Sequence, residues 1–228
     1  MSQVYRETPA ILLAGGREMD AQTTAEALSL LFRKIDRPKV AYIGAANGDR
    51  EAFFERICAL LLQAGADMVD FVRLAQETID IDAGRAMLSA ADVIFIAGGE
   101  VEDGMIWLQK HGLVSLLKSL YTEGRQFIGM SAGTIMLGTH WVRWDNPEDI
   151  AEGELFDCLG IIPAVFDTHA EDEDWIELKT ALRLLGEGSH GYGLPGGCII
   201  SADSSGQLIN RQRELLTFFY QNGEFELR

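Results

Sequence analysis

Positive charge is scarce in this chain of 228 residues, where 19 Lys and Arg stand against 35 Asp and Glu, for a formal net charge of −16. Nucleic acids and anionic membrane surfaces are bound by clustered lysine and arginine, so we expect neither as a partner. Cysteine is scarce too: Cys58, Cys158 and Cys198 have no spacing typical of a zinc site or a disulfide framework. We therefore expect no bound metal, and reduced thiols in the cytoplasm.

Long hydrophobic runs are also missing. Residues 1–10 lack the apolar segment typical of a signal peptide. The longest uncharged stretch, Gln126–Val142, is interrupted by glycines, a histidine and hydroxyl side chains. A membrane span needs about 20 apolar residues, so we expect none. What is present is an ordinary globular composition, 47% hydrophobic and 24% charged.

Short apolar runs alternate with amphipathic helical patterns along the whole chain. This alternation predicts βαβ units, and hence an α/β fold with a doubly wound, mostly parallel sheet and helices on both faces. We expect a single domain over residues 1–228, with a late hairpin formed by 198–203 and 207–210. Ligands of such sheets bind at the carboxyl edge of the strands. The expected strands lie at 9–16, 39–49 (with a turn), 68–74, 90–99, 127–130 and 159–169, and the expected helices include 20–33, 50–65 and 173–187.

The segment Gly129–Gly133 fits the pattern G-x-S-x-G between an apolar strand and a helix. In this context the pattern is typical of a nucleophile elbow, a sharp turn that lifts the Ser131 hydroxyl into a cleft. The Ala132 N–H at the start of the helix and the Gly99 N–H after a central strand are candidate donors to an oxyanion. The alternative is that both glycine-rich segments are turns that serve packing only.

A serine nucleophile needs a base, and the chain has 4 histidines. His140 would lie roughly 14 Å along the helix that follows Ser131, at its wrong end. His111 lies towards the far end of a crossover helix and His190 precedes a strand, so both belong to the opposite edge of the sheet. His169 ends a predicted strand at the same edge as Ser131 and is the expected general base.

The acid that orients this base has several candidates. If the Trp-rich segment before it forms a short strand that returns to the cleft, Asp145 would support His169 as the third member of a triad. Asp167, Glu171 and Glu173 compete for this role because they lie close to His169 in sequence.

A run of acidic residues, Glu171–Asp174, follows His169. We expect it to form the first turn of the helix over 173–187, where negative charge complements the helix dipole. The alternative is that it attracts a cationic group of the substrate. The tryptophans at 107, 141, 144 and 175 are assigned to packing rather than to a site.

Four segments occur in a characteristic order: AADVIFIAGG (90–99), FIGMSAGTIML (127–137), FDTH (166–169) and GYGLPGG (191–197). Together they resemble the peptidase E and cyanophycinase family of serine peptidases, built on the class I glutamine amidotransferase-like fold. The resemblance extends over roughly residues 10–210. It implies Ser131 as nucleophile, His169 as base, an oxyanion hole at Gly99 and Ala132, and, in the dipeptidase branch, an acid close to Asp145.

The chain departs from this family at three places. Glu100 stands where relatives have Asn or Asp, and Gly196 stands where some relatives carry the triad Glu. The acidic segment Glu171–Trp175 replaces an Arg-containing segment that holds the substrate carboxylate in relatives that cleave beside aspartate. Because carboxylates repel an aspartyl side chain, we expect no strict aspartyl specificity unless Lys179 and Arg183 point into the cleft.

These observations lead to one expected function and two competing ones. We expect a serine peptidase or amide hydrolase of short peptides that needs no cofactor; homodimers are common for such folds. A non-catalytic ligand-binding or regulatory homologue is the second possibility, suggested by Gly196. A glutaminase-like amidotransferase is ranked last, because that class has cysteine at the position of Ser131.

Overall fold

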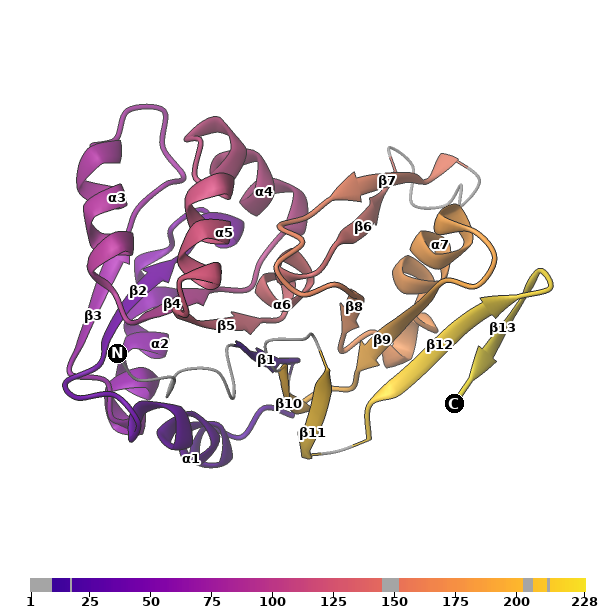
Figure 1. Cartoon of the computed structure of the whole chain (residues 1–228), viewed down its shortest axis with the longest axis horizontal. Coiled ribbons are helices and arrows are strands. Elements are labelled where there is room, and N and C mark those ends of the chain that lie inside the picture. The colour runs from indigo at the N-terminus through magenta and orange to yellow at the C-terminus, as the bar shows by residue number, and fades with distance from the viewer. Residues whose placement is uncertain (1–9, 17, 145–151, 203–206, 213) are drawn as a thin grey trace.

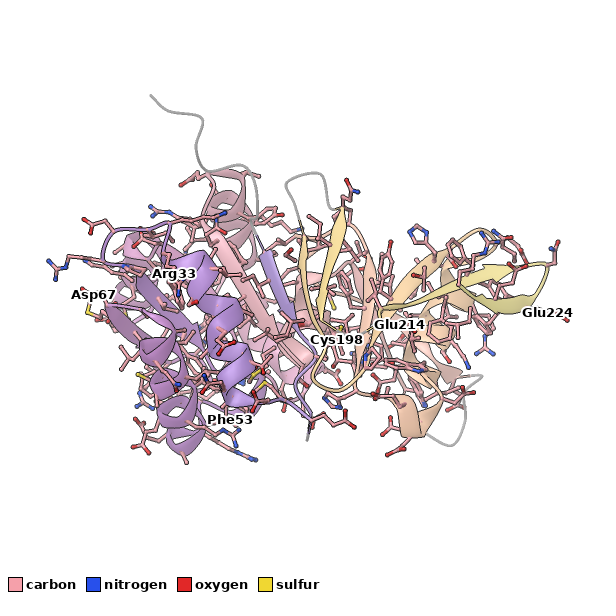
Figure 2. The ribbon with its side chains drawn as sticks, turned by 90° about the horizontal axis from the view of Figure 1, so that it is seen from below. Arg33, Phe53, Asp67, Cys198, Glu214 and Glu224 are labelled. Carbon is pink, nitrogen blue, oxygen red and sulfur yellow. The ribbon has the colours of Figure 1, made fainter. Side chains whose placement is uncertain are left out.

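A computed structural model describes residues 10–16, 18–144, 152–202, 207–212 and 214–228. The chain forms a large sheet flanked by helices, a smaller sheet beside it, and a two-stranded ribbon (Figure 1). Asp67, next to the large sheet, and Glu224, on the smaller sheet, lie towards opposite ends of the molecule (Figure 2).

The large sheet has 7 strands in the order β11-β10-β1-β5-β4-β2-β3. Neighbouring strands in the series β1-β5-β4-β2-β3 are parallel. At the other edge, β10 pairs with β1, and β11 with β10, in antiparallel fashion. The predicted α/β class and mostly parallel sheet are therefore confirmed, and the late hairpin appears as β10 and β11. The strands are β1 (Ala10–Leu13), β2 (Lys39–Ile43), β3 (Met68–Val72), β4 (Val93–Ile96), β5 (Gln126–Met130), β10 (Ile199–Ala202) and β11 (Leu208–Gln212).

Helices cover both faces of this sheet. Alternate residues of β4 show why: Val93 and Phe95 pack towards α1 and α2, whereas Ile94 and Ile96 pack towards α3–α6. Both faces of the strand are buried, as in doubly wound sheets. The helices are α1 (Ala21–Phe32), α2 (Glu51–Ala64), α3 (Ile81–Ala90), α4 (Val101–Lys110), α5 (Val114–Thr122) and α6 (Ala132–Leu137), with a 3₁₀ turn, η1 (Ala45–Asn47), after β2.

The smaller sheet was not predicted. It has 4 strands in the order β13-β12-β9-β8, and β6 pairs with β7 in a separate ribbon. Its core forms around the apolar face of α7, where Leu178, Ala181 and Leu182 meet Val165 and Phe218. The elements are β6 (His140–Arg143), β7 (Glu154–Asp157), β8 (Val165–Thr168), α7 (Ile176–Leu185), β9 (His190–Leu194), β12 (Leu216–Gln221) and β13 (Glu224–Leu227).

Two local predictions in this region were wrong. The segment 159–169 was expected to be one strand of the large sheet, but only Val165–Thr168 is extended, and it belongs to the smaller sheet. The acidic run was expected to begin the following helix. Instead Glu171–Glu173 forms a separate 3₁₀ turn, η3, and Trp175 has a φ of 57°, so α7 starts at Ile176. That left-handed residue breaks the helical path between the acids and α7.

None of the described helices is both long enough and apolar enough to cross a membrane. The three cysteines, Cys58, Cys158 and Cys198, are all among the described residues and are free thiols.

Candidate active site

Ser131 occupies a sharp turn between β5 and α6. Its φ of 52° and ψ of −122° are unusual for a residue with a side chain. The Ser131 N–H donates to the Leu13 carbonyl at 2.9 Å, and the Thr134 N–H donates to the Ser131 carbonyl at 2.7 Å. These bonds fix the peptide units on both sides of the residue, so the strained conformation is held by its neighbours.

The small residues around Ser131 are required by close backbone packing. A Cβ at Gly133 would lie 2.0 Å from the Ile96 carbonyl oxygen, and one at Gly129 would lie 2.7 Å from the Gly133 carbonyl oxygen. A Cβ at Gly98 would come within 3.0 Å of the Ser131 Cβ. The turn is therefore wedged against the end of β4, which explains why the motif needs glycine at both flanks.

His169 comes to Ser131 from the smaller sheet. It follows β8 with a φ of 46°, and its N–H donates to the Leu194 carbonyl of β9 at 2.8 Å. The Ser131 Oγ and the His169 Nε2 lie 2.8 Å apart. The structure thus brings together the two residues that the sequence singled out. The expectation that both lie at the edge of one common sheet was wrong, however, because β8 is not a strand of the large sheet.

Two glycines after β1 lie against the Ser131–His169 pair. A Cβ at Gly15 would lie 3.3 Å from the Ser131 Cβ, and one at Gly16 would lie 3.2 Å from the His169 Cβ. Both have positive φ, 75° and 80°. Neither glycine was assigned to the site from the sequence. The sequence feature that could have indicated them is the Gly-Gly pair directly after β1, because β1 is the parallel neighbour of β5 and the two strands end at the same edge.

The two predicted oxyanion donors line the same cleft as Ser131. Gly99 has a φ of 145°, and a Cβ there would lie 2.0 Å from the Ala46 carbonyl oxygen. The following N–H, of Glu100, donates to that oxygen at 2.7 Å, which fixes the backbone of the segment. Ala132 is the first residue of α6, where backbone N–H groups have no partner within the helix.

The cleft has a volume of about 300 Å³. One wall is formed by α4 and the elbow, which belong to the large sheet and its helices. The other wall is formed by β6, β8 and α7. Four of its residues are carboxylic acids, and none is lysine or arginine. The lining residues are Gly99, Glu100, Val101, Ser131, Ala132, Ile135, Trp141, Asp167, Thr168, His169, Ala170, Glu173 and Glu177.

One of the acids, Asp167, is buried, and a second, Glu177, is half-buried. Asp167 is 4% exposed, and its Oδ1 accepts the Thr168 N–H at 2.7 Å. Burial raises the pKa of Asp167 to about 7, and the charge of Glu177 is the next largest cause. The backbone N–H groups of Thr168 and Leu178 act in the opposite direction and lower this pKa. Burial also raises the pKa of Glu177, which accepts a hydrogen bond from the Trp141 indole N–H at 2.5 Å.

The other histidines lie away from this cleft. The His111 Nε2 is 2.8 Å from the Leu74 carbonyl oxygen, and its ring stacks on Trp107. The His140 Nε2 is 3.6 Å from an Asp157 carboxylate oxygen. His190 begins β9, exposed. Of the described histidines, only His169 is among the residues that line the cleft.

Comparison with known proteins gives the family. Residues 10–209 match the sequence pattern of Peptidase family S51. The chain belongs to peptidase family S51. The resemblance predicted from the motifs is thereby confirmed.

The relatives of this S51 chain include proteins described as Peptidase E. The one from Streptomyces coelicolor is 30% identical over 136 residues, which are 60% of this chain and 53% of that protein. The one from Shewanella oneidensis is 34% identical over 85 residues, 37% of this chain and 36% of that protein. The chain therefore matches about half the length of the first and about a third of the second.

Solved structures resemble this S51 chain in fold. A peptidase from an acI-B1 Actinobacterium superposes with a TM-score of 0.69 at 16% identity, covering 99% of this chain and 96% of that one. A putative Peptidase E protein from Listeria monocytogenes gives a TM-score of 0.63 at 15% identity, covering 91% and 100%. At such identities the likeness concerns the fold alone.

The acid that would orient His169 in this S51 chain stays a prediction. Asp145 lies outside the described residues, although the short strand expected before it is present as β6. Glu171 places its Oε1 2.7 Å from the backbone nitrogen of Gly196, the position where some relatives carry Glu. Glu173 and Asp167, which are also candidates for this acid, line the cleft.

Positive charge does not enter the cleft from α7. The Lys179 Nζ pairs with the Asp174 carboxylate at 2.8 Å, and neither Lys179 nor Arg183 is among the lining residues. Within the described ranges, no group of three or more His, Cys, Asp and Glu side chains is arranged to hold a metal ion. The part of the cleft that the structure describes is therefore lined by acids without a lysine or arginine.

Proposed function

We propose that this chain is a serine peptidase that hydrolyses amide bonds of short peptides. The observation that carries the proposal is the 2.8 Å contact between the Ser131 Oγ and the His169 Nε2, at a strained elbow inside a cleft. This contact has the geometry needed for an imidazole to accept the proton of an attacking hydroxyl.

The proposed reaction uses the residues of this cleft in the following way. The Ser131 Oγ attacks the carbonyl carbon of the substrate as its proton passes to the His169 Nε2. The N–H groups of Gly99 and Ala132 stabilise the negative oxygen of the tetrahedral intermediate. The imidazolium then protonates the leaving amine, and a water molecule, deprotonated by His169, releases the acyl group from Ser131. Asp145 is proposed to orient the imidazole.

Substrate size is limited by the cleft. Its volume of about 300 Å³ is at the lower end of ordinary ligand sites. Short peptides fit such a space better than loops of folded proteins. The free thiols favour the cytoplasm as the proposed location.

Labelling with a fluorophosphonate tests the nucleophile directly. We expect wild-type protein to be labelled once, at Ser131, and Ser131→Ala to be unlabelled. His169→Ala should be labelled at least about a hundredfold more slowly, because the hydroxyl loses its base. Ser115→Ala is the matched control, since Ser115 is an exposed serine on α5 and should not affect labelling.

Hydrolysis of a short-peptide library, followed by mass spectrometry, tests the activity. Products that appear with wild type and Ser115→Ala but not with Ser131→Ala would support the proposal. Equal labelling of wild type and Ser131→Ala would remove it. Binding of peptides without turnover would favour the non-catalytic homologue, and ammonia release from glutamine would favour the amidotransferase.

A further inference from the structure

The acidic wall of the cleft suggests which substrates the site takes, an inference that rests on the proposed peptidase function. Asp167, Glu177, Glu173 and Glu100 all line the space that contains Ser131. Among the described lining residues, His169 is the only one that can carry a positive charge. In the part of the lining that the structure describes, the negative charge of this wall thus faces no lysine or arginine.

One oxygen of this wall is buried and has no partner. Asp167 is 4% exposed, and its Oδ1 accepts the Thr168 N–H at 2.7 Å. The nearby Leu178 N–H favours the charged form of this carboxyl, but the Oδ2 has no hydrogen-bond partner in the described part of the chain. A buried carboxylate oxygen without a donor is costly, so this position suits a donor that arrives with a ligand.

A second carboxylate is held in place beside it. The Trp141 indole on β6 donates to Glu177 Oε2 at 2.5 Å, which orients that carboxylate at the start of α7. The charge of Glu177 raises the pKa of Asp167, and the charges of Glu173 and Glu100 raise that of Glu177. The four groups therefore repel one another, and a cation among them would relieve this repulsion.

The geometry points to a cation subsite in the cleft, where Asp167 and Glu177, with Glu173 and Glu100, bind a protonated nitrogen group of the peptide substrate. The group is either the α-ammonium of a free N-terminus or the side chain of a lysine or arginine. Charge-assisted hydrogen bonds to carboxylates are stronger than neutral ones. Because Ser131 lines the same small cleft, the cation lies within a residue or so of the bond that is cleaved.

Matched peptides distinguish the two sources. The parent is an uncharged, acetylated tetrapeptide amide of alanine and norleucine. One counterpart has a free N-terminus, and two others carry lysine in place of a single norleucine. We expect kcat/KM of at least one charged peptide to exceed that of the parent about tenfold or more, the effect of one charge-assisted hydrogen bond. The peptide that shows it identifies the source.

Charge-removing variants locate the subsite. Asp167→Asn and Glu177→Gln should each lower the ratio of kcat/KM between the preferred charged peptide and the parent about tenfold. Asp172→Asn is the matched control, because Asp172 is an exposed acid of the same acidic segment that does not line the cleft, and it should keep the ratio. Using the ratio separates a loss of recognition from a general loss of folded enzyme. A ratio near one in wild type, or one that survives both substitutions, would overturn the inference.

Binding without catalysis separates this inference from the proposed function. N-acetyl-lysine amide, norleucine amide and the uncharged N-acetyl-norleucine amide are compared for their effect on the Tm of Ser131→Ala protein. We expect a cationic amide to raise the Tm more than the uncharged one, and the effect to disappear when Asp167→Asn or Glu177→Gln is added. Cation binding without any hydrolysis would leave the subsite standing and the peptidase function rejected. Hydrolysis with equal Tm shifts for all three amides would reject the subsite and leave the peptidase function standing.

Discussion

At Ser131 the chain holds a conformation that residues with side chains seldom adopt, with φ at 52°. Such strain persists only where surrounding contacts impose it. At Ser131 those contacts come from the Leu13 carbonyl and from the glycines at 98 and 133. The hydroxyl direction therefore depends on atoms that do no chemistry themselves.

Gly98→Ala tests this dependence. A Cβ at Gly98 would lie 3.0 Å from the Ser131 Cβ and 3.2 Å from the Met130 carbonyl oxygen, so the elbow must shift by a few tenths of an ångström. We expect the rate of fluorophosphonate labelling to fall about 10- to 100-fold, since small misplacements of a nucleophile are costly. In the control Gly84→Ala on α3, the new Cβ makes only an ordinary contact with Val72. Labelling of Gly98→Ala at the wild-type rate would contradict this account of the elbow.

The buried carboxyl of Asp167 makes stability depend on pH. Its pKa is raised to about 7, whereas an unfolded aspartate titrates at about 3.9. Between these values the folded chain keeps a proton that the unfolded chain has released. The free energy of unfolding therefore falls as pH rises from about 4 to about 7. Above about pH 7 the carboxyl is ionised in both states, and the whole destabilisation caused by its burial is present.

Asp167→Asn should remove this cost. We expect the variant to be more stable than wild type at pH 8 by on the order of 2–4 kcal/mol, with the difference shrinking towards pH 4. Urea unfolding of both proteins at pH 4, 5, 6, 7 and 8 measures it. A difference that does not change with pH would show that Asp167 does not titrate in this range.

At the scale of elements, local patterns predicted the large sheet well. Apolar runs such as Val93–Ile96 are buried on both faces, and Gly65 ends α2 with a φ of 113° as its sequence position indicated. These signals lie within a few residues of one another. The elbow was predictable for the same reason, because strand, serine and helix are consecutive.

The smaller sheet escaped prediction because its pairings are distant. β8 has four residues, and its partner β9 begins at His190, beyond η3 and α7. Asp167 lies in this strand, and a carboxylate is ordinarily taken as exposed, so nothing in the local pattern indicates that it is buried. The acidic wall of the cleft forms only where α7 packs beside β8 in the folded chain. The hydrophobic periodicity of a segment indicates its secondary structure but not its contacts with segments that are distant in sequence.

The position of His169 depends on how this smaller sheet packs, which Gly193→Ala tests. Gly193 pairs with Asp167 across β8 and β9, and a Cβ there would lie 2.8 Å from the Trp175 ring. We expect about 1–3 kcal/mol of destabilisation from overpacking, together with slower labelling of Ser131. Adding Trp175→Leu should restore part of the labelling rate by making room. An unchanged Tm and labelling rate in Gly193→Ala would show that the packing of β9 on α7 does not hold His169.

The whole molecule shares the charge sign of its cleft. A net charge of −16 surrounds a site walled by Asp167, Glu177, Glu173 and Glu100. A protein field of one sign concentrates counter-ions and speeds their association. The same field disfavours anionic peptides before they reach the cleft. The overall charge would thus reinforce the preference for cationic peptides that we infer for the cleft.

Ionic strength separates these two contributions. The Debye length falls from about 30 Å at 0.01 M salt to about 10 Å at 0.1 M, so long-range attraction is screened while contacts inside the cleft are screened less. We expect kcat/KM for the preferred cationic peptide to fall about 3- to 10-fold over this range, and that of the uncharged parent to change less than about twofold. Asp167→Asn should keep most of this salt dependence, because one buried charge contributes little to the distant field, while losing the preference measured at high salt. A uniform decline for charged and uncharged peptides would mean that salt acts on the enzyme rather than on the approach of a cation.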